Sequence, residues 1–162
     1  MAKKVSAHGK QAGIFLDKSE MMKVNRRLKS KMKDIAGLLV GQLSYIGEEC
    51  VRTARESGSY NDITGNLRSS VGYVVLYDGK PVVYGAPKQY DGKKGHGEAG
   101  PPAAEALLTS LQAEYPRGIV LIVCAGMKYA VYVEAVHHKD VLTSAKLKAE
   151  SLARKLLKVL VE

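Results

Sequence analysis

The sequence predicts an α+β fold in which a long N-terminal helix and a C-terminal helix pack on an antiparallel four-stranded sheet. Both ends of the chain show apolar residues at three- and four-residue spacing, the period of amphipathic helices. The middle shows two pairs of strand-like segments, without the strand–helix–strand alternation of a parallel sheet. A short helix and a Gly/Pro-rich loop lie between the two expected hairpins. The 162 residues fit one domain, 19–162, preceded by a basic arm, 1–18.

The first helix is expected to begin near Ser19 and to end before Gly58. Its apolar stripe consists of Leu28, Met32, Ile35, Leu39, Leu43, Ile46 and Cys50. Each glycine inside a helix costs up to ~1 kcal/mol relative to alanine. Because this helix contains Gly37, Gly41 and Gly47, we expect either the close approach of another backbone or a bend.

The first hairpin is predicted by a switch to a period of two residues. Val71–Tyr77 and Lys80–Tyr84 are strand-like, and Asp78-Gly79 between them suits a two-residue turn. Pro81 has no N–H to donate to a sheet. The second strand is therefore expected at an edge, or its start lies outside the pairing.

The second hairpin is expected after a surface loop and a short helix. Residues 85–102 are rich in glycine and proline, and the helix should follow at Ala103–Tyr115. Ile119–Cys124 is apolar throughout, as in a central strand that is covered on both faces. Lys128–Ala135 alternates between apolar faces, and the tight Ala125-Gly126 link makes the two strands antiparallel.

The last helix is expected to begin at Asp140, whose carboxylate can cap its first turn. Its apolar stripe consists of Leu142, Ala145, Ala149, Leu152, Leu156 and Leu160. Basic residues are concentrated toward its C-terminal end, where they suit the helix dipole.

The net charge of +9 is concentrated at the N-terminus. Residues 1–33 carry ten basic and two acidic side chains, a net charge of +8, whereas the rest of the chain carries +1. This asymmetry indicates an anionic neighbour, either nucleic acid or an acidic protein surface. The alternative is a solvated arm that keeps the protein soluble. The candidate contacts are Lys3, Lys4, Lys10, Arg26 and Arg27.

The Gly-rich segment 92–97 adds Lys93 and Lys94 to these candidates. It lacks the spacing of a phosphate-binding loop, and no strand leads directly into it. Its two lysines and its backbone N–H groups would contact phosphates in one reading. In the other reading the segment is a mobile basic loop.

Residues for catalysis or for metal binding do not form a recognisable pattern, so no enzyme activity, cofactor or metal is expected. Cys50 and Cys124 both lie in apolar stretches and are predicted to be reduced core thiols, which fits assembly in a cytoplasm. Glu134 is the one acid in an otherwise apolar strand, and an edge-facing or inter-subunit salt bridge is favoured over a catalytic role. No apolar run approaches the ~20 residues needed to span a membrane.

Two motifs in order along the chain resemble a known family. Thr64-Gly-Asn-Leu-Arg-Ser-Ser70 precedes the first hairpin, and Tyr129-Ala-Val-Tyr-Val-Glu134 lies near the last helix. The combination resembles the tail-completion family of long-tailed, lambda-like phages, also described as neck or head–tail joining proteins, over roughly residues 20–160. The segment Ala135–Asp140 departs from the family, which usually has a glycine there and a Pro-Phe-Leu-like helix start. The Gly-rich loop is also longer than in the family.

The resemblance implies a structural virion protein that works through subunit contacts. It implies a homo-oligomer, a hexameric ring around the DNA channel, beside tail-tube, tail-terminator or connector proteins and with non-specific contacts to DNA. The candidate interface residues are Tyr60, Thr64, Leu67, Arg68 and Glu134.

The residues of the first motif also have a physical reading. Gly65 would supply a backbone angle that other residues avoid, Leu67 would anchor the turn on the core, and Arg68 would meet a carboxylate in the same chain or the next. The alternative is that the segment is a turn with no role beyond leading into the strand. The alternative function is a stand-alone basic nucleic-acid-binding protein, whose surface would be residues 1–33 and the loop lysines.

Overall fold

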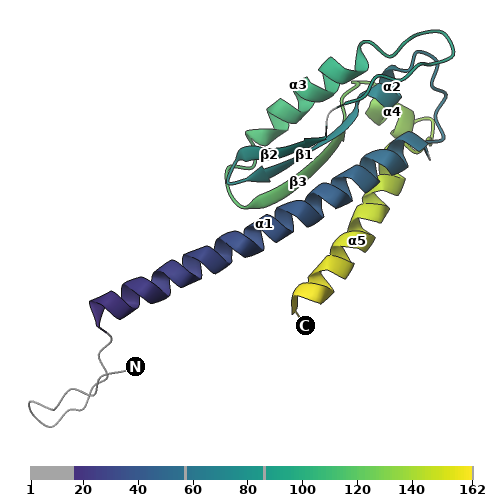
Figure 1. Ribbon diagram of the computed structural model, residues 1–162. Helices are drawn as coiled ribbons and strands as arrows, with labels where there is room; N and C mark the ends of the chain where they lie inside the picture. Colours follow the sequence, from purple (N-terminus) through teal and green to yellow (C-terminus); the bar gives the residue numbers. More distant parts are fainter. Residues whose placement is uncertain (1–16, 57, 86, 162) are drawn as a thin grey trace, which may run out of the picture. The chain divides into compact units, whose positions relative to one another are not determined.

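The computed structural model describes residues 17–56, 58–85 and 87–161 (Figure 1). The chain divides into two compact units, Met1–Leu38 and Leu39–Glu162. The elements, in order, are α1 (Lys18–Glu56), α2 (Asn66–Ser69), β1 (Val71–Tyr77), β2 (Lys80–Gly85), α3 (Gly100–Gln112), β3 (Ile119–Ala125), α4 (Ala130–Ala135) and α5 (Thr143–Val161). The α+β class is as predicted. Most of both long helices and the first hairpin also lie where the periodicity places them.

The prediction of a four-stranded sheet is wrong. The described part of the chain contains one three-stranded antiparallel sheet in the order β2-β1-β3. The central strand is β1, whose residues Val71–Leu76 are all buried. The strand β3 was expected at the centre but lies at one edge, and β2, which contains Pro81, lies at the other.

The missing strand is Lys128–Ala135, of which Ala130–Ala135 forms the helix α4. After β3 the ladder with β1 ends at Gly126, whose N–H donates to the Ser70 carbonyl over 2.9 Å, and the chain then enters a turn in which the Ala130 N–H donates to the Met127 carbonyl over 2.9 Å. A Cβ atom on Gly126 would lie 2.3 Å from the backbone of α3, so the chain is also held tightly there. In the helix, Ala130 and Val133 share one face and pack on the core. Tertiary contacts therefore override the alternating pattern.

Helices cover both faces of the sheet in the unit 39–162. On one face, Leu108 of α3 packs with β1 and β3 side chains such as Val74 and Ile122. On the other, residues of α1 and α5 enclose a larger core with Tyr73 and Val75 of β1. Figure 1 shows α3 on the opposite side of the sheet from α5. Helices therefore lie over both faces of β3, but β3 is an edge strand and four of its seven side chains are partly exposed.

Tyr73 attaches α1 to this core. Its ring is 2 % exposed, and a Cβ atom on Gly47 of α1 would lie 2.4 Å from it. The Tyr73 hydroxyl donates to Glu48 Oε1 over 2.9 Å. The close approach expected from the helix glycines is therefore found at Gly47, whereas a Cβ atom on Gly41 would have no neighbour within 4 Å.

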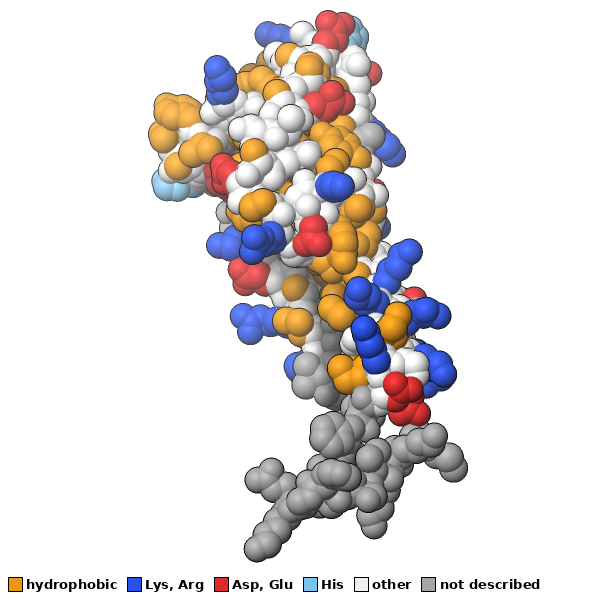
Figure 2. All heavy atoms as spheres, turned by 90° about the vertical axis from the view of Figure 1, so that its left-hand side faces the viewer, with side chains coloured by type: hydrophobic (Ala, Val, Ile, Leu, Met, Phe, Trp, Pro, Cys, Tyr) orange, Lys and Arg blue, Asp and Glu red, His pale blue; other side chains and the backbone are white. Residues whose placement is uncertain are grey.

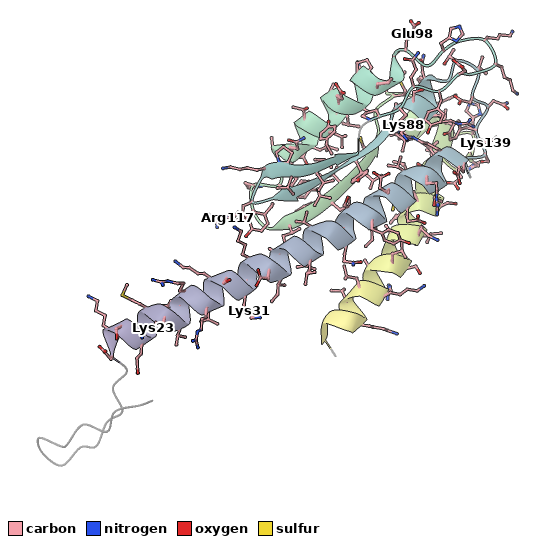
Figure 3. The ribbon with its side chains drawn as sticks, viewed as in Figure 1. Lys23, Lys31, Lys88, Glu98, Arg117 and Lys139 are labelled. Carbon is pink, nitrogen blue, oxygen red and sulfur yellow. The ribbon has the colours of Figure 1, made fainter. Side chains whose placement is uncertain are left out.

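The first unit is described from residue 17 onward and consists of the residues of α1 up to Leu38. Lys18–Leu38 contains seven basic and two acidic residues. Its apolar positions are also exposed, among them Met21, Leu28 and Met32 at 49 %, 55 % and 69 %. Lys23 and Lys31, labelled in Figure 3, extend from this segment. Among the described residues, no helix is both long enough and apolar enough to cross a bilayer.

Candidate functional site

The turn that precedes β1 is built around Gly65 and Leu67. Gly65 has a φ of 78°, which is left-handed backbone that side chains disfavour. A Cβ atom there would also lie 2.1 Å from the Tyr90 carbonyl oxygen. Leu67 is 4 % exposed and packs in the main core. Both physical predictions for this turn are confirmed.

The turn holds the Gly-rich loop in place through backbone hydrogen bonds. The N–H groups of Lys93, Lys94 and Gly97 donate to the carbonyls of Asp62, Ile63 and Thr64 over 3.2, 2.7 and 2.9 Å. This part of the loop is thus laid along the turn residue by residue, which argues against the expectation of a mobile loop.

The two serines of the first motif complete this attachment. Ser69 Oγ accepts from the Tyr90 N–H over 2.8 Å, and Ser70 Oγ donates to the Leu67 carbonyl over 2.8 Å. Both serines are fully buried. Their hydroxyls therefore satisfy buried backbone groups and stabilise the turn and the loop.

Arg55 of α1 connects β1 with the Gly-rich loop. Its guanidinium donates to the Val71 carbonyl over 2.6 Å and lies 5.1 Å from the centre of the Tyr90 ring. Sequence reasoning missed both residues. The one available signal was that Tyr90 is the only aromatic residue in the Gly/Pro-rich stretch.

Arg68 finds its carboxylate within the same chain. Its Nε lies 3.3 Å from Asp62 Oδ2, an ion pair without the alignment of a hydrogen bond. The Asp62 side chain is only 10 % exposed. Burial raises the pKa of the Asp62 carboxyl, and the Arg68 charge and nearby backbone N–H groups counteract this only in part.

A cavity of about 590 Å³ brings three of the predicted interface residues together. Tyr60, Thr64 and Leu67 line it from the turn, and Tyr129 and Val133 line it from the start of α4 and from α4 itself. Lys139, labelled in Figure 3, also contributes to its wall. Arg68 lines instead a smaller, neighbouring cavity of about 310 Å³, together with Lys93.

Ile63 and Tyr129 line the larger cavity, and further exposed apolar side chains follow along α4 and at its end. We call this set the α4 patch; it consists of Ile63 (52 % exposed), Tyr129 (40 %), Val131 (75 %), Tyr132 (56 %) and Val136 (53 %). Figure 2 shows that hydrophobic side chains reach the surface in clusters between the charged ones. Within the second motif, Ala130 and Val133 face the core, whereas both tyrosines face outward. Within the described chain Tyr132 packs edge-on against the His137 ring, with the ring centroids 5.2 Å apart, and Tyr129 lines the cavity.

Glu134 acts inside the chain. Its Oε1 accepts from the N–H groups of Leu142 and Thr143 over 3.1 and 2.8 Å and from the Thr143 hydroxyl over 2.6 Å. Burial alone would raise the pKa of the Glu134 carboxyl, but these donors outweigh it and lower the pKa. Glu134 thus caps α5 jointly with Asp140, which accepts from the Ser144 N–H over 3.0 Å as the sequence predicted.

The basic candidates are spread over both units. Arg26 and Arg27 are exposed on the N-terminal part of α1, and Lys93 and Lys94 are exposed on the loop. Lys3, Lys4 and Lys10, and with them most of the predicted arm, lie outside the described residues.

The two cysteines are free and buried, as predicted. Burial raises the pKa of the Cys124 thiol to about 11, so this thiol stays protonated at neutral pH. The Cys50 thiol lies 3.4 Å from the Ala145 carbonyl, to which it donates. Among residues 17–56, 58–85 and 87–161 no three His, Cys, Asp or Glu side chains are grouped so as to hold a metal ion.

Comparisons with protein-family models, with curated proteins and with solved structures find no match.

Proposed function

We propose that this chain is a non-enzymatic structural subunit of a tailed-phage virion, a tail-completion or head–tail connector component that forms a ring around the DNA channel. The observation that supports the proposal best is the α4 patch. Tyrosine and aliphatic side chains that remain exposed on one chain are typical of surfaces that another subunit covers.

The sequence motifs support the same proposal. The residues that resemble the tail-completion family are Thr64–Ser70 and Tyr129–Glu134, and both segments meet at the 590 Å³ cavity. Thr64 and Tyr129 are the exposed members that line it. In the proposed ring, a neighbouring copy would contact Tyr129, Tyr132 and the mouth of this cavity.

A test is the molar mass of the purified protein, measured by light scattering across protein and salt concentrations. We expect a concentration-driven shift from monomer to a closed ring. Tyr132→Ser should raise the concentration at the midpoint of assembly at least tenfold. Tyr45→Ser is the matched control, because Tyr45 is 55 % exposed but lies outside the patch. Equal effects of the two substitutions, or a monomer at every concentration, would contradict the proposal.

A second candidate function, a stand-alone nucleic-acid-binding protein, is favoured by the segment Lys18–Leu38. Seven basic and two acidic residues lie there, and almost all are exposed. Binding through phosphates predicts an affinity that falls by roughly one log–log slope unit in salt for each contact. A monomer that binds DNA with such a steep salt dependence would favour this function over the ring.

A further inference from the structure

The two edges of the sheet are built differently. The edge strand β2 begins with Lys80 and Pro81, and its pairing with β1 shifts register between Val75 and Leu76. A charged residue, a proline and a bulge are devices that keep an edge strand from pairing with another chain. The edge strand β3 is Ile-Val-Leu-Ile-Val-Cys-Ala and has neither charge nor proline. Its seven pairs with β1 continue without a shift.

The pairing pattern identifies which backbone groups of β3 face outward. At the two ends of the ladder, the Asp78 N–H donates to the Gly118 carbonyl and the Gly126 N–H donates to the Ser70 carbonyl. Hydrogen-bonded and non-hydrogen-bonded pairs alternate along an antiparallel ladder. The backbone groups of Val120, Ile122 and Cys124 therefore point to β1, and those of Ile119, Leu121 and Val123 point away from it.

The same alternation explains the protection of β2. Tyr73, Val75 and Tyr77 of β1 must direct their hydrogen bonds to β2, where they face Gly85, Val83 and Lys80. Pro81 is then on the outward side of β2, so the missing donor is on the free edge. The chain blocks one edge of its sheet and leaves the other unblocked.

A groove beside the unblocked edge can accept side chains. It has a volume of about 400 Å³, and its apolar wall includes Leu121 and Val123 of β3 and Ala149 of α5. Four of the seven β3 side chains are partly exposed, whereas the β1 side chains from Val71 to Leu76 are buried. Within the described ranges, no hydrogen bond joins the outward side of β3 to another segment. Unpaired backbone groups next to an apolar groove are the two parts of a strand-addition site.

We propose that β3 pairs antiparallel with β3 of a second copy, across a two-fold axis. The partner is a strand because only an extended backbone satisfies a row of alternate N–H and C=O groups. In such a pair, residues directly opposite each other lie on the same face of the sheet. Leu121 and Val123 of each copy then fill the groove of the other.

Closure and the absence of charge at the edge favour a second copy as the partner. Residues 34–162 carry a net charge of only +1 and the segment Ile119–Ala125 is neutral, so charge does not oppose the approach of a second copy at this edge. A two-fold contact of one edge with itself closes after two copies. Two unblocked edges would instead extend the sheet indefinitely, and the protected β2 prevents this. One blocked and one unblocked edge therefore suit a closed pair.

This inference does not rest on the proposed ring. The β3 contact uses the sheet edge, whereas the proposed ring contact uses the α4 patch. A pair formed through β3 would bury the edge whether or not the copies assemble further.

The test combines molar mass with amide exchange on the full chain. We expect a reversible dimer in sedimentation equilibrium. In hydrogen exchange followed by NMR, the amides of Ile119, Leu121 and Val123 should gain at least tenfold protection as protein concentration rises through the dimer midpoint. The amides of Val120, Ile122 and Cys124 should be protected throughout. This period of two residues is specific to strand pairing.

Val123→Pro removes one outward N–H and retains a similar apolar volume, so we expect it to raise the dimer dissociation constant at least tenfold. Val123→Thr is the matched control, because it has nearly the shape of valine and retains the N–H. Its effect should be less than threefold. If Val123→Pro does not fold, the hydrogen-exchange pattern of the unsubstituted protein alone tests whether β3 pairs with a second copy.

Three outcomes would overturn the inference. They are a monomer up to millimolar concentration, association without protection of the three outward amides, or equal effects of the proline and the threonine. A ring that forms while these amides stay unprotected would overturn the β3 pair and leave the proposed function standing.

Discussion

The cap that Glu134 provides for α5 can be tested by Glu134→Gln. The substitution keeps the shape of the side chain and removes the charge. Three donors converge on one carboxylate oxygen over 2.6–3.1 Å. Hydrogen bonds to a charged group are worth about 1.5–3 kcal/mol when buried. Because Glu134 is partly exposed, the lower range found for helix caps, about 0.5–2 kcal/mol, applies.

We therefore expect Glu134→Gln to lower the free energy of unfolding by about 1 kcal/mol, and Glu134→Ala by about 2 kcal/mol. For a chain of this length, each kcal/mol corresponds to a fall in Tm of roughly 2–4 °C. Urea denaturation and thermal unfolding followed by circular dichroism measure both quantities. Glu150→Gln is the control, since it makes the same charge change at an exposed position of α5.

The pH dependence gives an independent check. Since the folded state lowers the pKa of Glu134 below its ordinary value of 4.5, the unfolded chain takes up the proton first as the pH falls. The stabilisation by the charge is complete well above pH 4.5 and is lost as the pH falls through the lower folded-state pKa. The difference between Glu134→Gln and the unsubstituted protein should shrink over this window. Equal effects of the two glutamine substitutions at pH 7 would refute the reasoning.

Three further predictions concern the glycines and Ser69. Gly47→Ala should destabilise the protein by about 1–3 kcal/mol in urea denaturation, because the new methyl group meets the buried Tyr73 ring. Gly41→Ala should be neutral or stabilise the protein by up to about 1 kcal/mol, and the reverse order of the two substitutions would contradict this packing. Gly65→Ala should lower the free energy of unfolding by more than about 2 kcal/mol, since the alanine would combine left-handed backbone with a clash against the Tyr90 carbonyl. A measured loss below about 1 kcal/mol would count against this geometry. Ser69→Ala should cost about 1–3 kcal/mol by leaving the Tyr90 N–H without its acceptor, and the Tyr90 amide should exchange faster; an unchanged exchange rate would argue against this attachment.

Long periodic segments could be predicted from the sequence. The stripe of α1 predicted the helix, but only its C-terminal part, with Ile46 and Cys50, lies in the core, whereas Leu28, Met32 and Ile35 are exposed. The turn Asp78-Gly79 determines the register at the start of the β1–β2 hairpin, and Asp78 and Gly79 both adopt positive φ angles.

Short segments could not be predicted in the same way. Lys128–Ala135 fits the period of a strand, but Ala130–Ala135 forms a helix in which Ala130 and Val133 pack on the core and Glu134 binds the start of α5. Glu134 was expected to form a salt bridge at an edge or between subunits because the sequence gives no sign that the start of α5 lies beside it.

The candidate site was predicted in part. Thr64, Leu67 and Arg68 lie on the turn as the motif suggested, but Asp62 and Tyr90, which hold this turn and its loop, were missed. The hydrogen bond between Tyr90 and Ser69 joins segments that are distant in the sequence, and the Asp62–Arg68 ion pair depends on the tight backbone of the turn. Neither property leaves a periodic pattern in the sequence.

The attachment of the Gly-rich loop also bears on the order in which the sheet forms. Val75 pairs with Leu121, so β1 must find a strand more than forty residues later in the chain. A free connection of that length would make chain closure slow, because its entropy must be lost before the contacts form. Once Gly92–Gly97 is laid along the turn before β1, however, α3 begins at Gly100 beside the sheet. Only residues 113–118 then separate the end of α3 from β3. We therefore expect the attached loop to replace one distant encounter with a series of near ones, so that β3 joins the sheet quickly once α3 has formed.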